Sequence, residues 1–218
     1  MRHFRIFVLN LAPDILSVMS NELLNIAFTS IMHDLCGPGT RFVVWVQGCL
    51  NDCPDCIAPE WRKMVASRLI SPVDLAAEAS ISGDFDGITI SGGEPMLQAA
   101  GLAEFVRRIR GKKDVSVIVF TGYTIAELKI EPPGAGVGEF LDVIDVLIDG
   151  PYDELRNDDK GLRGSTNQRI HYLTGRISKG SFDFEGVDRQ AEVRIEDGGS
   201  ILVLGTPPKG LTRSLKGE

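Results

Sequence analysis

The sequence predicts an α/β protein, a partial (β/α) barrel of mostly parallel strands with a C-terminal β-hairpin extension. Four apolar runs, at 42–47, 88–91, 115–120 and 143–148, are typical of strands buried on both faces of a sheet. Helical patterns separate several of these runs, and such alternation favours parallel strands joined by right-handed crossovers. Two β-rich runs around a glycine-rich turn at 191–204 predict the hairpin.

The length of 218 residues suits one main core, which we place at 23–175, between an N-terminal extension at 1–22 and a C-terminal extension at 176–218. The net charge of -7 argues against a nonspecific nucleic-acid binder, which usually carries a basic face. No apolar run approaches the roughly 20 residues of a membrane span. Four cysteines, three of them clustered, favour a reducing compartment over secretion, so we expect a soluble cytoplasmic protein.

The remaining elements follow from local signals. Residues 23–34 predict a strand that leads into the turn "GPGTR" at 37–41. A helix is expected over 71–82, because Ser71 can cap it, Pro72 suits its first position, and Asp74 has the spacing of a capping box.

An amphipathic helix is expected over 98–110, and the capping-box pattern "TIAE" at 124–127 opens another, shorter helix. Residues 131–138 and 157–169 are expected to be loops, and 169–173 a short strand. The final residues, "TPPKGLTRSLKGE", are expected to fray.

The chemically distinctive loops all follow predicted parallel strands. The cysteine-rich stretch follows the strand at 42–47, and "GGEP", "TGY" and "DG" follow the next three strands. Because ligand sites of parallel α/β sheets lie at the carboxyl ends of the strands, we expect these loops to form one site. Thr121 and Asp149 stand at two of these strand ends and are candidate cosubstrate contacts, the alternative being that each caps the following turn.

Three of the four cysteines, Cys49, Cys53 and Cys56, lie within eight positions as Cys-x3-Cys-x2-Cys. Thiolates suit iron–sulfur clusters and zinc. Three ligands on a four-iron cluster leave one iron open for chemistry. The alternatives are a zinc site completed by Cys36 or His33, a disulfide with a spare thiol, and a redox pair of Cys53 and Cys56. Cys36 itself is expected to be a small buried apolar group.

The second motif is "SGGEP", with Gly92, Gly93 and Glu94 directly after a predicted strand. Glycines let a backbone approach a ligand without a Cβ clash. Glu94 would then place a carboxylate close to that ligand, where it could pair with an ammonium group through charge-assisted hydrogen bonds.

The Cys-x3-Cys-x2-Cys spacing with a downstream Gly-Gly-Glu-Pro resembles the radical S-adenosylmethionine superfamily. The resemblance implies a [4Fe–4S] cluster held by Cys49, Cys53 and Cys56, with Gly92, Gly93 and Glu94 helping to seat S-adenosylmethionine. It also implies reductive cleavage of that cosubstrate to a 5′-deoxyadenosyl radical.

Further stretches, "GPGTR", "VQGC", "TGYTIAEL", "VLIDGPY" and "LRGSTNQRIHYL", resemble the activating enzymes of the anaerobic ribonucleotide reductase, in the glycyl-radical enzyme activase branch. The implied partners are a glycyl-radical protein and an electron donor such as a flavodoxin or ferredoxin. Two alternatives stay open: a radical enzyme for another peptide or small molecule, and a zinc- or cluster-stabilised interaction module without catalysis.

Basic residues at 107–113 form a small cationic face on the predicted helix at 98–110. The simplest interpretation is a solvated surface, and the alternative is a docking site for an acidic electron donor.

Overall fold

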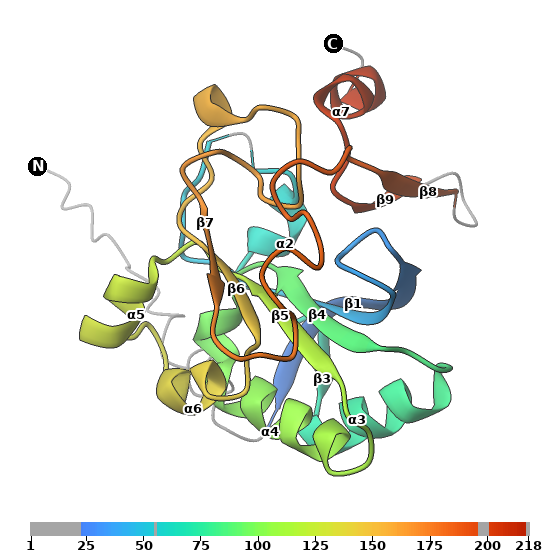
Figure 1. Ribbon diagram of the computed structural model, residues 1–218, viewed down its shortest axis with the longest axis vertical. Coiled ribbons are helices and arrows are strands. Elements are labelled where there is room, and N and C mark those ends of the chain that lie inside the picture. Colours follow the sequence, from blue (N-terminus) through green and yellow to red (C-terminus); the bar gives the residue numbers. More distant parts are fainter. Residues whose placement is uncertain (1–22, 55, 196–200, 217–218) are drawn as a thin grey trace, which may run out of the picture.

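The computed structural model describes residues 23–54, 56–195 and 201–216, so the N-terminal extension expected at 1–22 lies outside the described residues. Its centre is a seven-stranded sheet with the order β3-β1-β2-β4-β5-β6-β7, and β8 and β9 form a separate hairpin (Figure 1). The strands are β1 (Leu24–His33), β2 (Thr40–Val46), β3 (Arg68–Ile70), β4 (Gly87–Gly92), β5 (Ser116–Phe120), β6 (Val146–Asp149), β7 (Arg169–Tyr172), β8 (Ala191–Ile195) and β9 (Ile201–Gly205).

Helices and two 3-10 turns connect these strands, and α7 (Lys209–Lys216) follows the last of them. The connecting elements are α2 (Pro59–Arg62), α3 (Pro72–Ile81), η1 (Pro95–Gln98), α4 (Ala99–Arg110), α5 (Ile125–Ile130), α6 (Val137–Leu141) and η2 (Glu154–Arg156). Within the described part of the chain, no helix is long and apolar enough to cross a membrane.

The four central strands, β2, β4, β5 and β6, run parallel, as the alternating pattern predicts. The flanking strands β1, β3 and β7 pair in the antiparallel sense, so the sheet is mixed toward its edges. The α/β class, the parallel centre and the C-terminal hairpin are therefore confirmed. The described strands form a sheet whose edges are β3 and β7.

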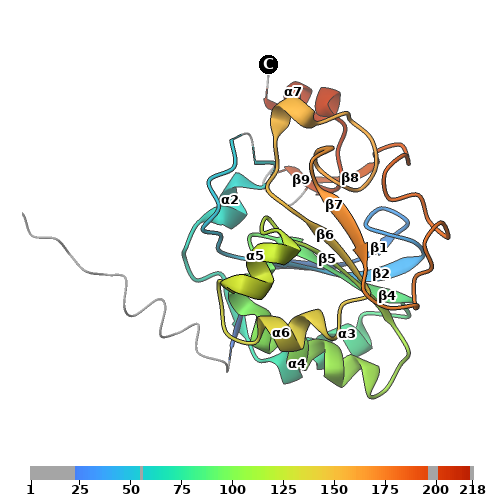
Figure 2. The same ribbon diagram turned by 60° about the vertical axis from the view of Figure 1, so that its left-hand side comes forward.

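Helices α3, α4 and α6 cover one face of the sheet (Figure 2). Side chains on β2 alternate between the two faces, as the two-residue period of a strand requires. Phe42, Val44 and Val46 point toward the helices, where Phe105 of α4 packs 6.2 Å from the ring of Phe42. The predicted apolar side of α4 is buried throughout: Leu102, Phe105, Val106 and Ile109.

The opposite face of the sheet is covered largely by the C-terminal residues. Phe184 and Ile177 pack on Ile118 of β5 and Ile148 of β6, and Leu204 of β9 packs near Trp45. Residues 176–195 and 201–205 therefore complete the burial of the central strands.

Four elements depart from the sequence expectations. Strand β3 and helix α2 arise in stretches to which the patterns assign no element. Helix α6 begins within the expected loop at 131–138, and it follows Gly136, whose φ of 77° lies in the left-handed region. The expectation that the last residues fray is wrong for 209–216, which form α7. Short elements of this kind depend on tertiary packing more than on local propensity.

The predicted caps are present. The Ser71 hydroxyl accepts a hydrogen bond from the Asp74 amide at 3.1 Å. Thr124 and Glu127 form a complete capping box, in which the Thr124 amide donates to Glu127 Oε2 at 2.7 Å.

Asp145, at the entrance to β6, joins three parts of the fold. Its fully buried carboxylate accepts hydrogen bonds from the Val117 amide at 2.6 Å, from Arg110 Nη2 at 2.5 Å and from Thr174 Oγ1 at 2.5 Å. The Leu173 amide donates to the Asp145 carbonyl at 2.8 Å. This carboxylate thus ties β5, α4 and the chain after β7 together at the end of the sheet where β5 and β6 begin.

We predict that Asp145→Asn lowers the free energy of unfolding by about 3 kcal/mol, because it removes the charge that compensates Arg110 in a buried pair. Urea denaturation followed by circular dichroism measures the change. The matched control is Asp84→Asn, which breaks the solvent-exposed ion pair with Lys113 and should leave stability nearly unchanged. Equal stability of both variants would contradict the assigned role of Asp145.

Candidate metal and cofactor site

The loops that follow β2, β4, β5 and β6 meet at one end of the molecule. Hydrogen bonds join neighbouring loops in turn. The Glu94 amide donates to the Gly48 carbonyl at 2.9 Å, and the Gly122 amide donates to Glu94 Oε2 at 2.9 Å. The Gly150 amide donates to the Tyr123 carbonyl at 3.1 Å. The four stretches expected to share a site therefore form a continuous rim.

Hydrogen bonds to the chain around α2 hold the base of the cysteine loop in place. The Gly48 amide donates to the Trp61 carbonyl at 2.8 Å, and the Cys49 amide donates to the Arg62 carbonyl at 3.0 Å. The buried Gln47 side chain adds a hydrogen bond to the Lys63 carbonyl at 2.6 Å. Helix α2 thus fixes where the loop leaves the sheet.

Cys49, Cys53 and Cys56 are all free thiols and all partly exposed. Burial raises the pKa of Cys49 to about 11 and also raises the pKa of Cys56. Iron must displace their protons, because the thiolate is the form that binds metal. Partly exposed thiols on a loop at the strand ends suit a cofactor that has to meet other molecules.

The three thiols of the cysteine loop have the donor chemistry of an iron–sulfur cluster. Among the described residues, no group of three or more His, Cys, Asp or Glu side chains could hold one metal ion. Each cysteine of a cubane binds a different iron, so its ligands need not converge on a point. The two residues suggested as a fourth zinc ligand lie elsewhere: Cys36 is buried beside Met32 and Val43, and His33 contacts Thr40 at 3.0 Å.

Gly92 and Gly93 pack against the backbone at the base of the cysteine loop, a contact that the sequence did not reveal. A Cβ at Gly92 would lie 2.5 Å from the Val46 nitrogen, and one at Gly93 would lie 2.3 Å from the Gly48 carbonyl oxygen. Gly92 also has a φ of 103°, which favours glycine. The two glycines therefore let the glycine turn pack backbone-to-backbone against the base of the cysteine loop.

Glu94 is the centre of the rim. Its carboxylate is only 1% exposed, and four donors surround it. Oε1 accepts from Thr121 Oγ1 at 2.8 Å and from the Met96 amide at 3.0 Å, while Oε2 accepts from the Gly122 amide at 2.9 Å and from Asn51 Nδ2 at 3.2 Å. Burial raises the pKa of Glu94, and these hydrogen bonds oppose the rise.

Thr121 and Asp149, both expected near the cosubstrate, occupy different surroundings. The buried Thr121 hydroxyl contacts Glu94 directly. The Asp149 carboxylate instead accepts a hydrogen bond from the Ile125 amide of α5 at 2.6 Å and lies 2.9 Å from His171 Nε2 of β7. The structure thus brings Thr121 to Glu94 and uses Asp149 to hold the elements on either side of β6.

Sequence reasoning missed Asn51 and Gly122 as partners of Glu94. Asn51 lies between the first two cysteines, where its residue type signals only a turn. Gly122 lies so close to Asn51 that a Cβ there would be 2.3 Å from Asn51 Nδ2. A polar side chain between two of the clustered cysteines was the one available signal.

The basic face expected on α4 is largely paired within the protein. Arg108 contacts Glu104, Arg110 contacts the buried Asp145, and Lys113 contacts Asp84. These side chains belong to the C-terminal part of α4 and the turn after it, which leads into the start of β5, so they lie away from the strand ends that carry the cysteine loop.

Comparison with known proteins gives one consistent answer. Residues 35–171, more than half of the chain, match the family described as the 4Fe-4S single cluster domain. The anaerobic ribonucleoside-triphosphate reductase-activating protein of Escherichia coli (strain K12) is 33% identical over 150 residues, covering 63% of this chain and 91% of the relative. Its namesake in Pasteurella multocida (strain Pm70) is 35% identical over 149 residues, covering 63% of this chain and 90% of the relative.

A shorter match links the chain to a second activase. The pyruvate formate-lyase-activating enzyme of Listeria monocytogenes serovar 1/2a is 37% identical over 92 residues, covering 40% of this chain and 37% of the relative. The resemblance to the glycyl-radical enzyme activase branch is therefore confirmed. The chain belongs to the 4Fe-4S single cluster domain family and to the family of anaerobic ribonucleoside-triphosphate reductase-activating proteins.

Proposed function

We propose that this chain is a radical S-adenosylmethionine enzyme that generates a glycyl radical on a partner protein such as an anaerobic ribonucleotide reductase. The observation that carries the proposal is the union of two motifs: the loop of free cysteines and the buried Glu94 share one hydrogen-bonded rim. The activating proteins among its relatives support the partner class.

Cys49, Cys53 and Cys56 would hold the [4Fe–4S] cluster. When bound, a reduced cluster of this type supplies one electron to the sulfonium of S-adenosylmethionine, whose C–S bond breaks to give methionine and a 5′-deoxyadenosyl radical. The protein's own work is to bind, to orient and to exclude water.

Glu94 would bind the ammonium group of S-adenosylmethionine. Its hydrogen bond with Asn51, at 3.2 Å, is the longest of the four that it accepts. We infer that the Asn51 amide yields its place when the cosubstrate binds, since an ammonium donor makes a stronger, charge-assisted hydrogen bond with a carboxylate. Thr121 and the Gly122 amide would keep the carboxylate in position.

The wider assignments follow from this chemistry. Abstraction of a hydrogen atom needs no acid or base from the protein, so no catalytic dyad is assigned. An open edge of a partial barrel at β7 would admit a loop of the partner to the rim. We place the enzyme in the cytoplasm. Its electron donor would be a flavodoxin- or ferredoxin-like protein. We expect this donor to dock near the rim and not on α4, because Arg108 and Arg110 of α4 already form ion pairs within the protein.

The direct test uses reduced, reconstituted enzyme with S-adenosylmethionine and the glycyl-radical subunit of an anaerobic ribonucleotide reductase. We predict a carbon-centred radical in the electron paramagnetic resonance spectrum that depends on all three components. Cosubstrate cleavage with no radical on that subunit would instead support another peptide or small molecule as the substrate.

We predict that Cys53→Ala loses 5′-deoxyadenosine formation, because the cluster loses a ligand. The wild type should carry about four irons and about four sulfides per chain after anaerobic reconstitution. Cys36→Ala is the matched control, since Cys36 packs in the core and should not change the iron content. Full turnover in Cys53→Ala would contradict the ligand assignment, and one zinc per chain would support a structural metal module.

Glu94→Gln is expected to weaken binding of S-adenosylmethionine by about tenfold or more, because the neutral amide loses a charge-assisted hydrogen bond. Calorimetric titration of the anaerobic protein measures the affinity, and iron analysis reports on the cluster. Glu78→Gln, which changes an ion pair with Arg68 away from the rim, should bind normally. Loss of iron with unchanged affinity would show that Glu94 only supports the cysteine loop.

A further inference from the structure

The connection between β6 and β7, residues 150–168, rises at the same end of the molecule as the cysteine loop (Figures 1 and 2). It carries η2, whose central residue Leu155 is 96% exposed. The neighbours of Leu155 are held in place, since the Leu155 amide donates to Asp153 Oδ1 at 3.0 Å and the Thr166 amide donates to the Arg156 carbonyl at 2.9 Å. A fixed backbone therefore presents an apolar side chain to solvent.

The C-terminal extension pairs with this connection through its backbone. The Gly161 amide donates to the Val187 carbonyl at 2.8 Å, and the Leu162 amide donates to the Phe184 carbonyl at 2.9 Å. A Cβ at Gly161 would lie 2.4 Å from the Phe184 carbonyl oxygen, so the two segments are in close contact. Because Phe184 is itself buried against the sheet, the extension joins the connection to the core.

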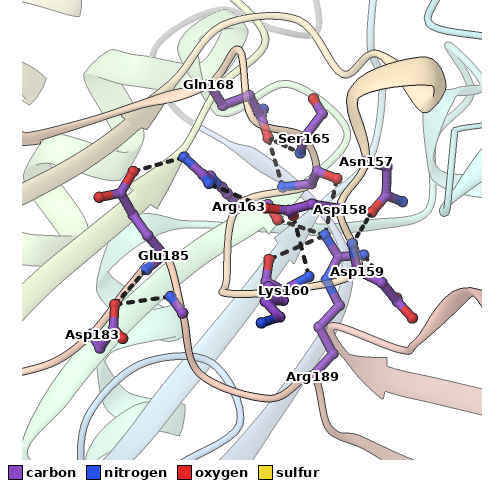
Figure 3. A network of polar contacts seen from close by, with 12 residues as sticks. Asn157, Asp158, Asp159, Lys160, Arg163, Ser165, Gln168, Asp183, Glu185 and Arg189 are labelled. Atoms are coloured by element: carbon purple, nitrogen blue, oxygen red, sulfur yellow. Dashed lines mark hydrogen bonds and ion pairs between the residues drawn. The ribbon is translucent and has the colours of Figure 1, made fainter.

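Arg189 is the central side chain of this contact (Figure 3). Its Nη2 atom donates to the carbonyls of Arg163 at 2.8 Å and Gly164 at 3.0 Å, and its Nη1 atom lies 3.6 Å from Asp159 Oδ1. The side chain is only 5% exposed. A buried guanidinium that binds two successive carbonyls holds the backbone in one conformation.

A second pair strengthens the same contact. Arg163 points back toward the extension and binds Glu185 Oε1 at 2.7 Å (Figure 3). The Lys209 amide, further along the extension, donates to Asp159 Oδ1 at 2.9 Å. Three separate points of the C-terminal chain thus engage the connection.

The contact continues to the rim through Gln168. Its Oε1 atom accepts from the Gly164 amide at 2.7 Å, and its Nε2 atom donates to the Gly150 carbonyl at 2.7 Å. Ser165, fully buried, accepts from the Asp153 amide at 3.1 Å and so reaches the residues that enter η2. Arg189 therefore acts on η2 through the bend at 163–168.

Large apolar side chains are exposed on both segments at this end. Leu50 and Ile57 of the cysteine loop are 62% and 61% exposed, and Leu155 stands on the connection at the same end of the molecule. Single exposed apolar residues are ordinary, but exposed apolar residues at the end that carries a functional loop are suited to binding a protein. The reacting part of a protein substrate must come to this end of the molecule, because the cysteines are here.

We propose that the C-terminal extension fixes the 150–168 connection so that Leu155 contacts the glycyl-radical partner, with Arg189 as the positioning residue. The inference rests on the proposed function, since it names the surface with which that substrate is bound. The family match ends at residue 171, before Arg189. The proposed positioning contact thus lies outside the matched region.

The contact is tested with Leu155→Ser, a fully surface change that should not disturb folding. We expect the KM for the partner protein to rise about three- to tenfold, with unchanged 5′-deoxyadenosine formation in the absence of the partner. Ile81→Ser is the matched control, because Ile81 is 86% exposed at the end of α3. An unchanged KM for Leu155→Ser would overturn the proposed contact.

The positioning role is tested with Arg189→Gln. The control is Arg194→Gln, which changes an arginine of the same extension that binds Glu192 and Ser30, both outside the 150–168 connection. We expect Arg189→Gln to speed hydrogen exchange at the amides of 161–166 and to raise the KM for the partner, while its iron content and partner-free cosubstrate cleavage stay normal. Arg194→Gln should do neither.

Two results would overturn the role of Arg189: unchanged exchange at 161–166, or faster exchange with an unchanged KM. A wild-type enzyme that cleaves S-adenosylmethionine but never activates the partner would instead contradict the proposed function. Should Arg189→Gln fail to fold, Gly161→Ala tests the same contact, because its Cβ would lie 2.4 Å from the Phe184 carbonyl oxygen. Gly175→Ala is its control, because a Cβ at Gly175 meets nothing within 4 Å.

Discussion

A single buried carboxylate organises the rim of this protein. Glu94 is nearly free of solvent contact, and a buried charge is costly unless hydrogen bonds surround it. Its partners come from three places: its own turn, the end of β5, and the cysteine loop. The same interactions that compensate for its burial therefore set the spacing between those loops. A ligand that binds Glu94 acts on all three at once.

Close backbone packing makes this arrangement possible. Gly92 and Gly93 let the turn after β4 lie against Val46 and Gly48, which are the last residue of β2 and the entrance to the cysteine loop. A side chain at either glycine would push the cysteines away from Glu94. The glycines are thus required by contact between two parts of the protein, whether or not a ligand also lies close to them.

The two faces of the sheet are buried by different parts of the chain. Helices between the strands cover one face, as expected for parallel β–α–β units. The other face is covered by the C-terminal residues, with Phe184 against β5 and β6 and Leu204 near β2. An extension that contributes to the core can also hold a loop at the rim rigidly, because its own position is fixed by packing. The polar contacts of Arg163 and Arg189 are built on that base.

Residue patterns were enough to predict the parallel centre of the sheet, the caps at Ser71 and Thr124, and the meeting of the cysteine and glycine motifs at one rim. These depend on local periodicity, on residue type and on the rule that parallel strands end at the same edge. Three other features emerged only in the folded chain: Asn51 binds Glu94, Asp149 contacts α5 and β7, and residues 209–216 form a helix. Each of these depends on contacts between residues distant in sequence, or on packing against them, and local patterns do not encode such contacts.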